Sequence, residues 1–192
     1  MVAGAARQVA DARSDGELWS AGDRESFAVL YERHAEAVWN YAYRLTASWS
    51  AADDLLGTVF LTAWRRRSSV RLVGDSALPW LKGVAATLTR GERRRLSRQI
   101  RALERMVDRE PEPDPAERIA RSSGDRYRLA MVLAAVARLP RRERAAVELC
   151  LLGQMPVREA AVVLGVGEAG LRSQLSRARR RLKDLVEEEW DD

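Results

Sequence analysis

The sequence predicts an all-α protein of two small helical domains, joined by an acidic, proline-rich linker, with a helix-turn-helix in the second domain. Apolar residues recur every three or four positions through most of the chain, and the alternation typical of strands is nearly absent. Prolines at alternate positions, from Pro111 to Pro115, prevent a regular helix in the middle of the chain. Towards the C-terminus, a proline, a short helix and a glycine precede another helix, which is the order of a helix-turn-helix.

The first domain is expected to begin near residue 22, after a flexible N-terminus over residues 1–21 that is rich in small and polar residues. Asp23 suits the N-cap of a first long helix. The buried stripe of this helix comprises Phe27, Leu30, Tyr31, His34, Val38, Tyr41, Ala42 and Leu45. His34 is the only histidine and has no second metal ligand nearby in the sequence, so we predict a packed core residue.

Ser50 is predicted to cap a second helix, with Asp53 in the first turn, where a carboxylate is favourable. The apolar face of this helix comprises Leu55, Leu56, Val59, Phe60, Ala63 and Trp64. A third helix is expected from Leu78, because Pro79 suits a first helical turn, and it continues into a cluster of arginines. A polar loop over residues 66–77 separates these two helices.

The linker is predicted at residues 107–123, between a first domain at 22–106 and a second at 124–186. We expect the two domains to move relative to each other until a partner fixes them. The net charge of +5 averages opposed blocks, since residues 90–105 contain seven arginines and two acids, whereas the tail at 187–192 is acidic and has no base. This distribution is typical of a protein that binds phosphates through defined surfaces.

The last long helix predicts a DNA-reading surface. Its core stripe is Leu171, Leu175, Ala178 and Leu182. The opposite face, suited to a DNA groove, carries Gly170, Ser173, Gln174, Arg177 and Arg181. Residues that flank this face, and that are expected to contact phosphates, are Arg172, Arg179, Arg180 and Lys183. The alternative is a basic, solvated helix face without a ligand.

Several classes of protein are excluded by composition. No apolar run approaches the roughly 20 residues of a membrane span, and the N-terminus lacks the pattern of a signal peptide, so we expect a cytoplasmic protein. Cys150 is the only cysteine and lies in an apolar helix, where a buried, inert thiol is expected. There is no metal-ligand cluster, nucleophile with its base, or phosphate-binding glycine loop, so we predict no enzymatic activity and no cofactor.

The chain resembles the extracytoplasmic-function (ECF) sigma factors of bacterial RNA polymerase over about residues 24–185. The resemblance is carried by FAVLYERH at 27–34, YAYRL at 41–45, DDL at 53–55, VFLTAWR at 59–65, PWL at 79–81 and LPRRER at 139–144. It implies a promoter-specificity subunit whose first domain, similar to sigma region 2, binds core polymerase and the −10 element. The second domain, similar to region 4, would read the −35 element. Core polymerase would contribute its β′ coiled coil and β flap, and an anti-sigma factor is a further partner of such proteins.

The resemblance also implies roles for individual residues. Those expected to bind the β′ coiled coil are Asp53, Asp54, Leu55, Val59, Phe60 and Trp64, although some of the apolar members are alternatively core residues. Those expected to hold −10 DNA are Arg66, Arg67, Ser68, Ser69, Arg71, Asp75, Arg90, Arg93, Arg94, Arg95 and Arg98. Those expected at the −35 element are Gly170, Arg172, Ser173, Gln174, Arg177, Arg179, Arg180 and Arg181. Trp80 is a candidate for base stacking, but a core position is favoured.

The chain departs from the family pattern at a few positions. Leu56, Gly57 and Thr58 replace a typical Gln followed by an acid in the docking helix, and Thr87 and Gly91 replace polar residues associated with strand opening. Two alternatives therefore stand beside an active sigma factor. One is a sigma-like DNA-binding regulator without productive polymerase binding, and the other is a partner-binding module controlled by an anti-sigma protein.

Overall fold

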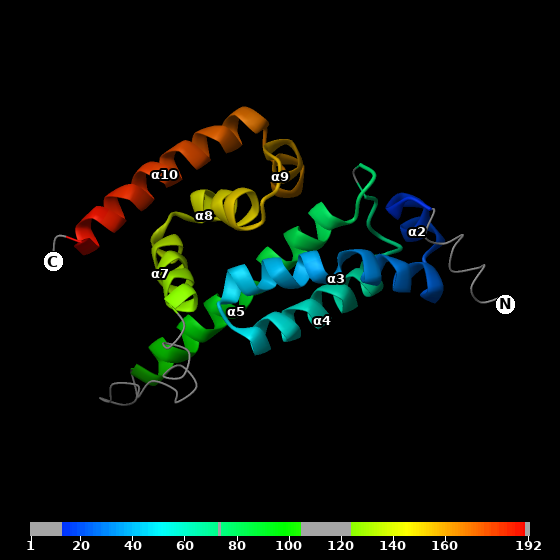
Figure 1. The fold of residues 1–192 in the computed structure, drawn as a ribbon, viewed down its shortest axis with the longest axis horizontal. Helices are drawn as coiled ribbons and strands as arrows, with labels where there is room; N and C mark the ends of the chain where they lie inside the picture. Colours follow the sequence, from blue (N-terminus) through cyan, green and yellow to red (C-terminus); the bar gives the residue numbers. More distant parts are fainter. Residues whose placement is uncertain (1–12, 73, 105–123, 191–192) are drawn as a thin grey trace.

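The computed structural model describes residues 13–72, 74–104 and 124–190, which form helices and turns with no strand among them. The N-terminal unit comprises α2 (Asp15–Ala21), α3 (Arg24–Thr46), α4 (Trp49–Arg66) and α5 (Leu78–Glu104). The C-terminal unit comprises α7 (Gly124–Arg138), α8 (Arg141–Val147), the π-helical turn η1 (Glu148–Leu152), α9 (Val157–Leu164) and α10 (Glu168–Trp190) (Figure 1). The all-α prediction is confirmed, while the predicted linker at residues 107–123 lies outside the described residues.

The segment before α3 differs from the predicted flexible end. A capping box between Ser14 and Glu17, with hydrogen bonds of 2.7 and 3.3 Å, begins α2. Leu18 and Trp19 are buried, and the Trp19 indole donates a hydrogen bond to the carbonyl of Val70 at 2.9 Å. The prediction of a flexible end is therefore wrong for α2. A helix of seven residues makes only about two turns, which is too short for a periodic stripe to be recognised.

The starts of the next three helices agree with the predictions for α3 and α5 and differ for α4. Asp23 accepts a hydrogen bond from Ser26 N–H at 2.8 Å and caps α3 as predicted, and α5 begins at Leu78 as predicted. The cap of α4 is Ser48 rather than Ser50. The difference arises because Ala47 ends α3 in the left-handed conformation, with φ of 52°, so the new helix starts immediately afterwards.

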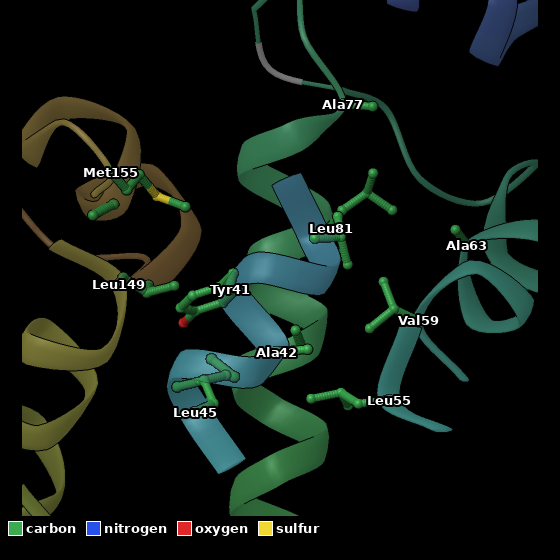
Figure 2. Close-up of a cluster of buried hydrophobic side chains, with 14 of the residues drawn as sticks. Tyr41, Ala42, Leu45, Leu55, Val59, Ala63, Ala77, Leu81, Leu149 and Met155 are labelled. Atoms are coloured by element: carbon green, nitrogen blue, oxygen red, sulfur yellow. The ribbon is translucent and has the colours of Figure 1, made fainter. Parts of the chain in front are cut away.

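One buried core crosses from the N-terminal unit into the C-terminal unit. Tyr41, Leu45 and their neighbours on α3 meet side chains from α4 and α5, and Leu149 and Met155 approach Tyr41 from the C-terminal unit (Figure 2). Each of these side chains is at most 4% exposed, and full burial of one large apolar side chain stabilises a fold by about 1.5–3 kcal/mol. Consequently, the units that the sequence predicts as separately mobile are packed together in this structure.

Polar contacts also cross the interface between the N-terminal and C-terminal units, which is called the seam below. Arg90 Nε lies 3.3 Å from the buried carboxylate of Glu148. Arg44 donates to the carbonyl of Leu152 at 2.6 Å, and Lys82 donates to that of Gly153 at 2.7 Å. Burial, together with the nearby carboxylate of Glu148, raises the pKa of the Tyr41 phenol. The seam therefore combines apolar burial with charge pairing and directed hydrogen bonds.

The helix-turn-helix is formed by α9 and α10. Gly165, with φ of 65°, ends α9, and its N–H donates to the carbonyl of Val162 at 3.1 Å. Leu171 and Leu175 are buried against the shared core, whereas Ala178 and Leu182 pack with a smaller cluster that includes Val136, Leu139 and Val147. The predicted core stripe of α10 is confirmed. This packing leaves the opposite side of α10 exposed.

Candidate functional site

The predicted polymerase-docking residues of α4 separate into exposed and buried members. Asp53 and Asp54 are exposed at the start of the helix. Leu55, Val59 and Phe60 are at most 9% exposed and belong to the core, so they cannot form the docking surface in this structure. The core alternative applies to these three residues because their side chains point towards α3 and α5, as Figure 2 shows for Leu55 and Val59.

The exposed face of α4 has apolar members that the sequence analysis did not assign. Trp49 is 61% exposed and Leu61 is 48% exposed, and both lie on the same side of the helix as Asp53 because they are four and eight residues from it. Gly57 lies between them, and a side chain added there would meet no atom within 4 Å. This face therefore presents two apolar side chains, a pair of acids and an open stretch of backbone. A helical-wheel plot could have indicated the exposure of Leu61.

The loop over residues 66–77, called the −10 loop below because its residues are predicted to hold −10 DNA, contains one structural arginine. The Arg67 guanidinium stacks 3.6 Å from the centroid of the Trp64 ring and donates to the carbonyls of Gly22 and Trp64 at 2.8 and 2.6 Å. These contacts occupy Arg67, and Trp64 packs edge-on against Phe27, so neither is a free surface group. By contrast, exposed side chains in the same segment are Arg66, Ser68, Ser69, Arg71 and Asp75.

The remaining −10 residues lie on or near α5. Trp80 is half-buried and packs edge-on against Trp19, with ring centroids 5.2 Å apart, which agrees with the core position favoured for it. Arg90 pairs with Glu148 across the seam, so its guanidinium is engaged by protein in this arrangement. The side chains of Arg93, Arg94, Arg95 and Arg98 lie outside the described residues, although α5 includes all four positions.

A basic groove of about 1400 Å³ lies between the two units. Its arginines come from both sides of the seam and are Arg66, Arg71, Arg90, Arg141, Arg142 and Arg158. The acidic side chains on its lining are Asp75 and Glu159, and its apolar lining includes Trp80 and Val163. Excess positive charge in a concave surface attracts phosphates or an acidic peptide.

Most of the residues predicted for the −35 surface are exposed on α10. Residues that are exposed there are Gly170, Arg172, Ser173, Arg177, Arg179, Arg180 and Arg181. Gln174 is half-buried and lines the groove instead of facing open solvent. Arg177 and Arg181 lie 3.5 and 3.1 Å from the carboxylate of Glu143 in α8, a pairing that sequence reasoning missed. The Glu143 carboxylate can orient these two guanidinium groups, both of which are 56% exposed.

A second buried pairing explains the only histidine. His34 is buried, as predicted, but its Nε2 lies 2.6 Å from a carboxylate oxygen of Asp15 in α2. Asp15 also accepts hydrogen bonds from Arg33 at 3.0 Å and from Ala77 N–H at 2.8 Å. Burial raises the pKa of Asp15, but these hydrogen bonds outweigh burial and hold the pKa below its ordinary value. The cluster is structural, because it joins α2 and α3 to the start of α5.

Two further features bear on the class of protein. Within residues 13–72, 74–104 and 124–190, no group of three or more His, Cys, Asp or Glu side chains is arranged to hold a metal ion. The described helices also include none with the length and apolarity needed to cross a membrane. Cys150 is half-buried, and burial raises the pKa of its thiol.

Comparisons with known proteins agree with the order of the two units. Family models of Sigma-70 region 2 and of Sigma-70, region 4 match residues 30–99 and 129–182. The ECF RNA polymerase sigma factor SigM of Mycobacterium tuberculosis is 32% identical over 179 residues, covering 91% of this chain and 85% of that protein. SigL, an ECF RNA polymerase sigma factor from the same species, is 28% identical over 176 residues, covering 88% of this chain and 93% of that protein.

Two solved structures share the fold. One is CnrH in complex with the cytosolic domain of CnrY, with a TM-score of 0.61, 20% identity, and coverage of 91% of this chain and 98% of CnrH. The other is the sigma factor RpoE in complex with the anti-sigma factor NepR from Bartonella quintana. Its TM-score is 0.58 and its identity 22%, with coverage of 85% of this chain and 98% of that chain.

The fold and the matched regions thus define a sigma-70-type transcription factor. More specifically, the chain belongs to the ECF RNA polymerase sigma factors and is an alternative sigma factor. Members of this class are DNA-binding regulators of transcription.

Proposed function

We propose that this sigma factor binds core RNA polymerase through the exposed face of α4 and directs it to promoters with a −10 and a −35 element. The observation that carries the proposal is the match to sigma regions 2 and 4, in that order, together with an arginine-rich exposed face on α10. In this proposal the chain supplies binding and positioning and catalyses no reaction of its own. Its place of action would be the cytoplasm, where polymerase and chromosomal DNA are found.

Each surface would contribute a different part of recognition. Asp53, Asp54 and Leu61 would contact the β′ coiled coil, because interfaces combine exposed apolar anchors with charged rims. The exposed −10 loop and the α5 arginines would hold DNA that has been opened, while α10 would enter the major groove of the −35 element. The β flap would bind the C-terminal unit.

An anti-sigma factor is the proposed regulator of this chain. The support is that both CnrH and RpoE were solved with protein partners, the second of which is named an anti-sigma factor. The basic groove between the units would suit an acidic segment of such a partner, because it gathers arginines from both units. A partner held there would also cover Gln174 and Arg71.

The proposal is tested by adding the purified full-length protein to core polymerase and mapping the transcripts made from genomic DNA. We expect new start sites that share sequence elements upstream and that are absent with core polymerase alone. Binding to DNA without any new start site would support the alternative, a sigma-like regulator, which the departures at Gly57, Thr58, Thr87 and Gly91 favour.

A further inference from the structure

Three aromatic side chains, two half-buried and one exposed, form a cluster where α3 approaches the start of α4. Trp39 and Tyr43 are one turn apart on α3, and their rings are stacked with an interplanar angle of 1° and centroids 5.7 Å apart. Trp49, the first residue of α4, lies 4.8 Å from the Trp39 ring and 5.4 Å from the Tyr43 ring. Although it makes these contacts, Trp49 remains 61% exposed.

A carboxylate holds the cluster in place. Asp53, one turn after Trp49, accepts a hydrogen bond from the Trp39 indole N–H at 2.6 Å. This bond fixes the plane of the Trp39 ring and places a negative charge beside the aromatic faces. Asp54 is exposed next to Asp53 and adds a second acid to the same end of the helix.

Packing alone does not account for this arrangement. Trp39 and Tyr43 are half-buried against the core, but Trp49 leaves most of its surface in water instead of filling a gap in that core. The electron-rich faces of aromatic rings attract cations, and the attraction strengthens when the cation is removed from water. Aromatic faces beside a carboxylate therefore suit the guanidinium or ammonium group of a partner side chain.

We propose that Trp39, Tyr43, Trp49 and Asp53 receive an arginine side chain of the polymerase surface that docks on α4. This inference rests on the proposed function, and charge complementarity and position both support it. Trp49 and Asp53 lie on α4, the proposed docking helix, and adjoin its exposed residues Asp54 and Leu61. Arginine is favoured over lysine because its flat guanidinium can stack on a ring while donating to a carboxylate.

The cluster would also compensate for the departure at the centre of α4. Gly57 and Thr58 stand where the family typically has a Gln followed by an acid, so this part of the face lacks side chains that contact a partner strongly. Thr58 in addition donates its hydroxyl to the carbonyl of Asp54 at 2.9 Å, which engages its polar atom within the helix. An anchor formed by Asp53 and Trp49, four and eight residues before Gly57, would supply the contact energy that the centre of the helix does not provide.

The test compares variants of the full-length protein in equilibrium binding to core polymerase, without DNA, at two salt concentrations. Trp49→Leu keeps an apolar side chain but removes the aromatic face, and Trp49→Phe restores a ring. Asp53→Asn keeps the shape near Trp39 but removes the charge. We expect Trp49→Leu to raise Kd by about 5- to 30-fold, with partial recovery in Trp49→Phe. Asp53→Asn should raise Kd and weaken its dependence on salt.

Two controls make the outcome decisive. Unfolding midpoints of the variants should match that of the unsubstituted protein, and Glu25→Gln, which removes an exposed acid at the opposite end of α3, should leave Kd unchanged. If the unsubstituted protein binds core polymerase and Trp49→Leu binds equally well, the aromatic cluster has no such role, while the proposed function stands. If the unsubstituted protein does not bind core polymerase, the proposed function fails and this inference fails with it.

Discussion

At the scale of single residues, the buried Asp15 carboxylate is held by contacts with Arg33, His34 and the N–H of Ala77. We expect Asp15→Asn to lower the free energy of unfolding by about 1–3 kcal/mol at neutral pH, because the buried groups around it lose a charged acceptor. The folded pKa of Asp15 lies below its ordinary value of 3.8, so its contribution is complete above that pH and is lost as the pH falls towards the folded pKa. Urea unfolding at a series of pH values measures this contribution of Asp15 to the free energy of unfolding.

Comparing the pH dependence of stability in the unsubstituted protein and in Asp15→Asn isolates the contribution of Asp15, since the two proteins share every other titrating group. The difference in stability between them should shrink as the pH falls below the ordinary aspartate pKa of 3.8. A difference that stays the same down to acid pH would show that the charge of Asp15 contributes nothing.

Arginines on α10 should differ in how they contribute to promoter recognition. Arg177 is oriented by Glu143, so Arg177→Ala should cost about 1–3 kcal/mol on the preferred −35 element and relax selection at one position. Arg180 is exposed on the flank, so Arg180→Ala should weaken all sequences alike and reduce the salt slope by roughly one unit. Holoenzyme binding to −35 variants at several salt concentrations measures both. If both variants lose the same binding free energy on every −35 sequence, the α10 arginines form only a nonspecific electrostatic surface.

At the scale of helices, two glycines should respond to alanine in opposite directions. Gly57 lies on the exposed face of α4 with no atom within 4 Å of the added side chain, so Gly57→Ala should raise the free energy of unfolding by about 0.5–1 kcal/mol. Gly153 ends η1, where an added Cβ would lie 2.4 Å from the carbonyl oxygen of Leu149. Gly153→Ala should therefore destabilise the protein. Thermal unfolding of both variants provides the comparison, and the same direction of change in both would contradict the described packing.

Most elements could be predicted from the sequence because their signals are local. Asp23 caps its own helix, Gly165 ends α9, and the stripe from Leu171 to Leu182 follows helical spacing. The cap at Ser48 could not be predicted with the same ease, because Ser50 offers an equally suitable side chain and only the conformation of Ala47 decides between them.

Contacts between distant segments account for the parts of the site that sequence could not provide. The exposed members of the docking helix depend on which side of α4 meets α3 and α5, and this separated Asp53 and Asp54 from Leu55, Val59 and Phe60. Likewise, nothing near Arg177 or His34 in the sequence indicates Glu143 or Asp15 as a partner, since each pair is brought together only by helix packing.

At the scale of the whole molecule, the seam between the two units should depend on Glu148. Glu148→Gln keeps the side-chain shape but removes the charge that faces Arg90, so it should lower the free energy of unfolding by about 1–3 kcal/mol and loosen the packing of the units. Small-angle X-ray scattering should then give a larger radius of gyration. Glu25→Gln, the same change at an exposed position in the first turn of α3, is the matched control and should leave the radius unchanged. An unchanged radius in both variants would mean that this ion pair does not help to hold the units together.

The packed arrangement also sets a requirement for promoter recognition. Gln174 and Arg71 line one groove, although the −35 and −10 elements that they are proposed to contact are separate stretches of DNA. If these contacts are made as proposed, the two units would move apart when the sigma factor joins polymerase and spans a promoter. Variants with a loosened seam, such as Glu148→Gln, would bind core polymerase at least as tightly as the unsubstituted protein.

Detection of single-stranded thymines by permanganate on one mapped promoter tests most directly whether this chain directs polymerase to open a promoter. With core polymerase and the sigma factor together, we predict reactive thymines at the −10 element and a transcript starting just downstream. Core polymerase alone and the sigma factor alone should leave the same thymines unreactive. Binding of the chain to this promoter without polymerase, with no reactive thymines when polymerase is added, would contradict the account and identify the chain as a DNA-binding regulator.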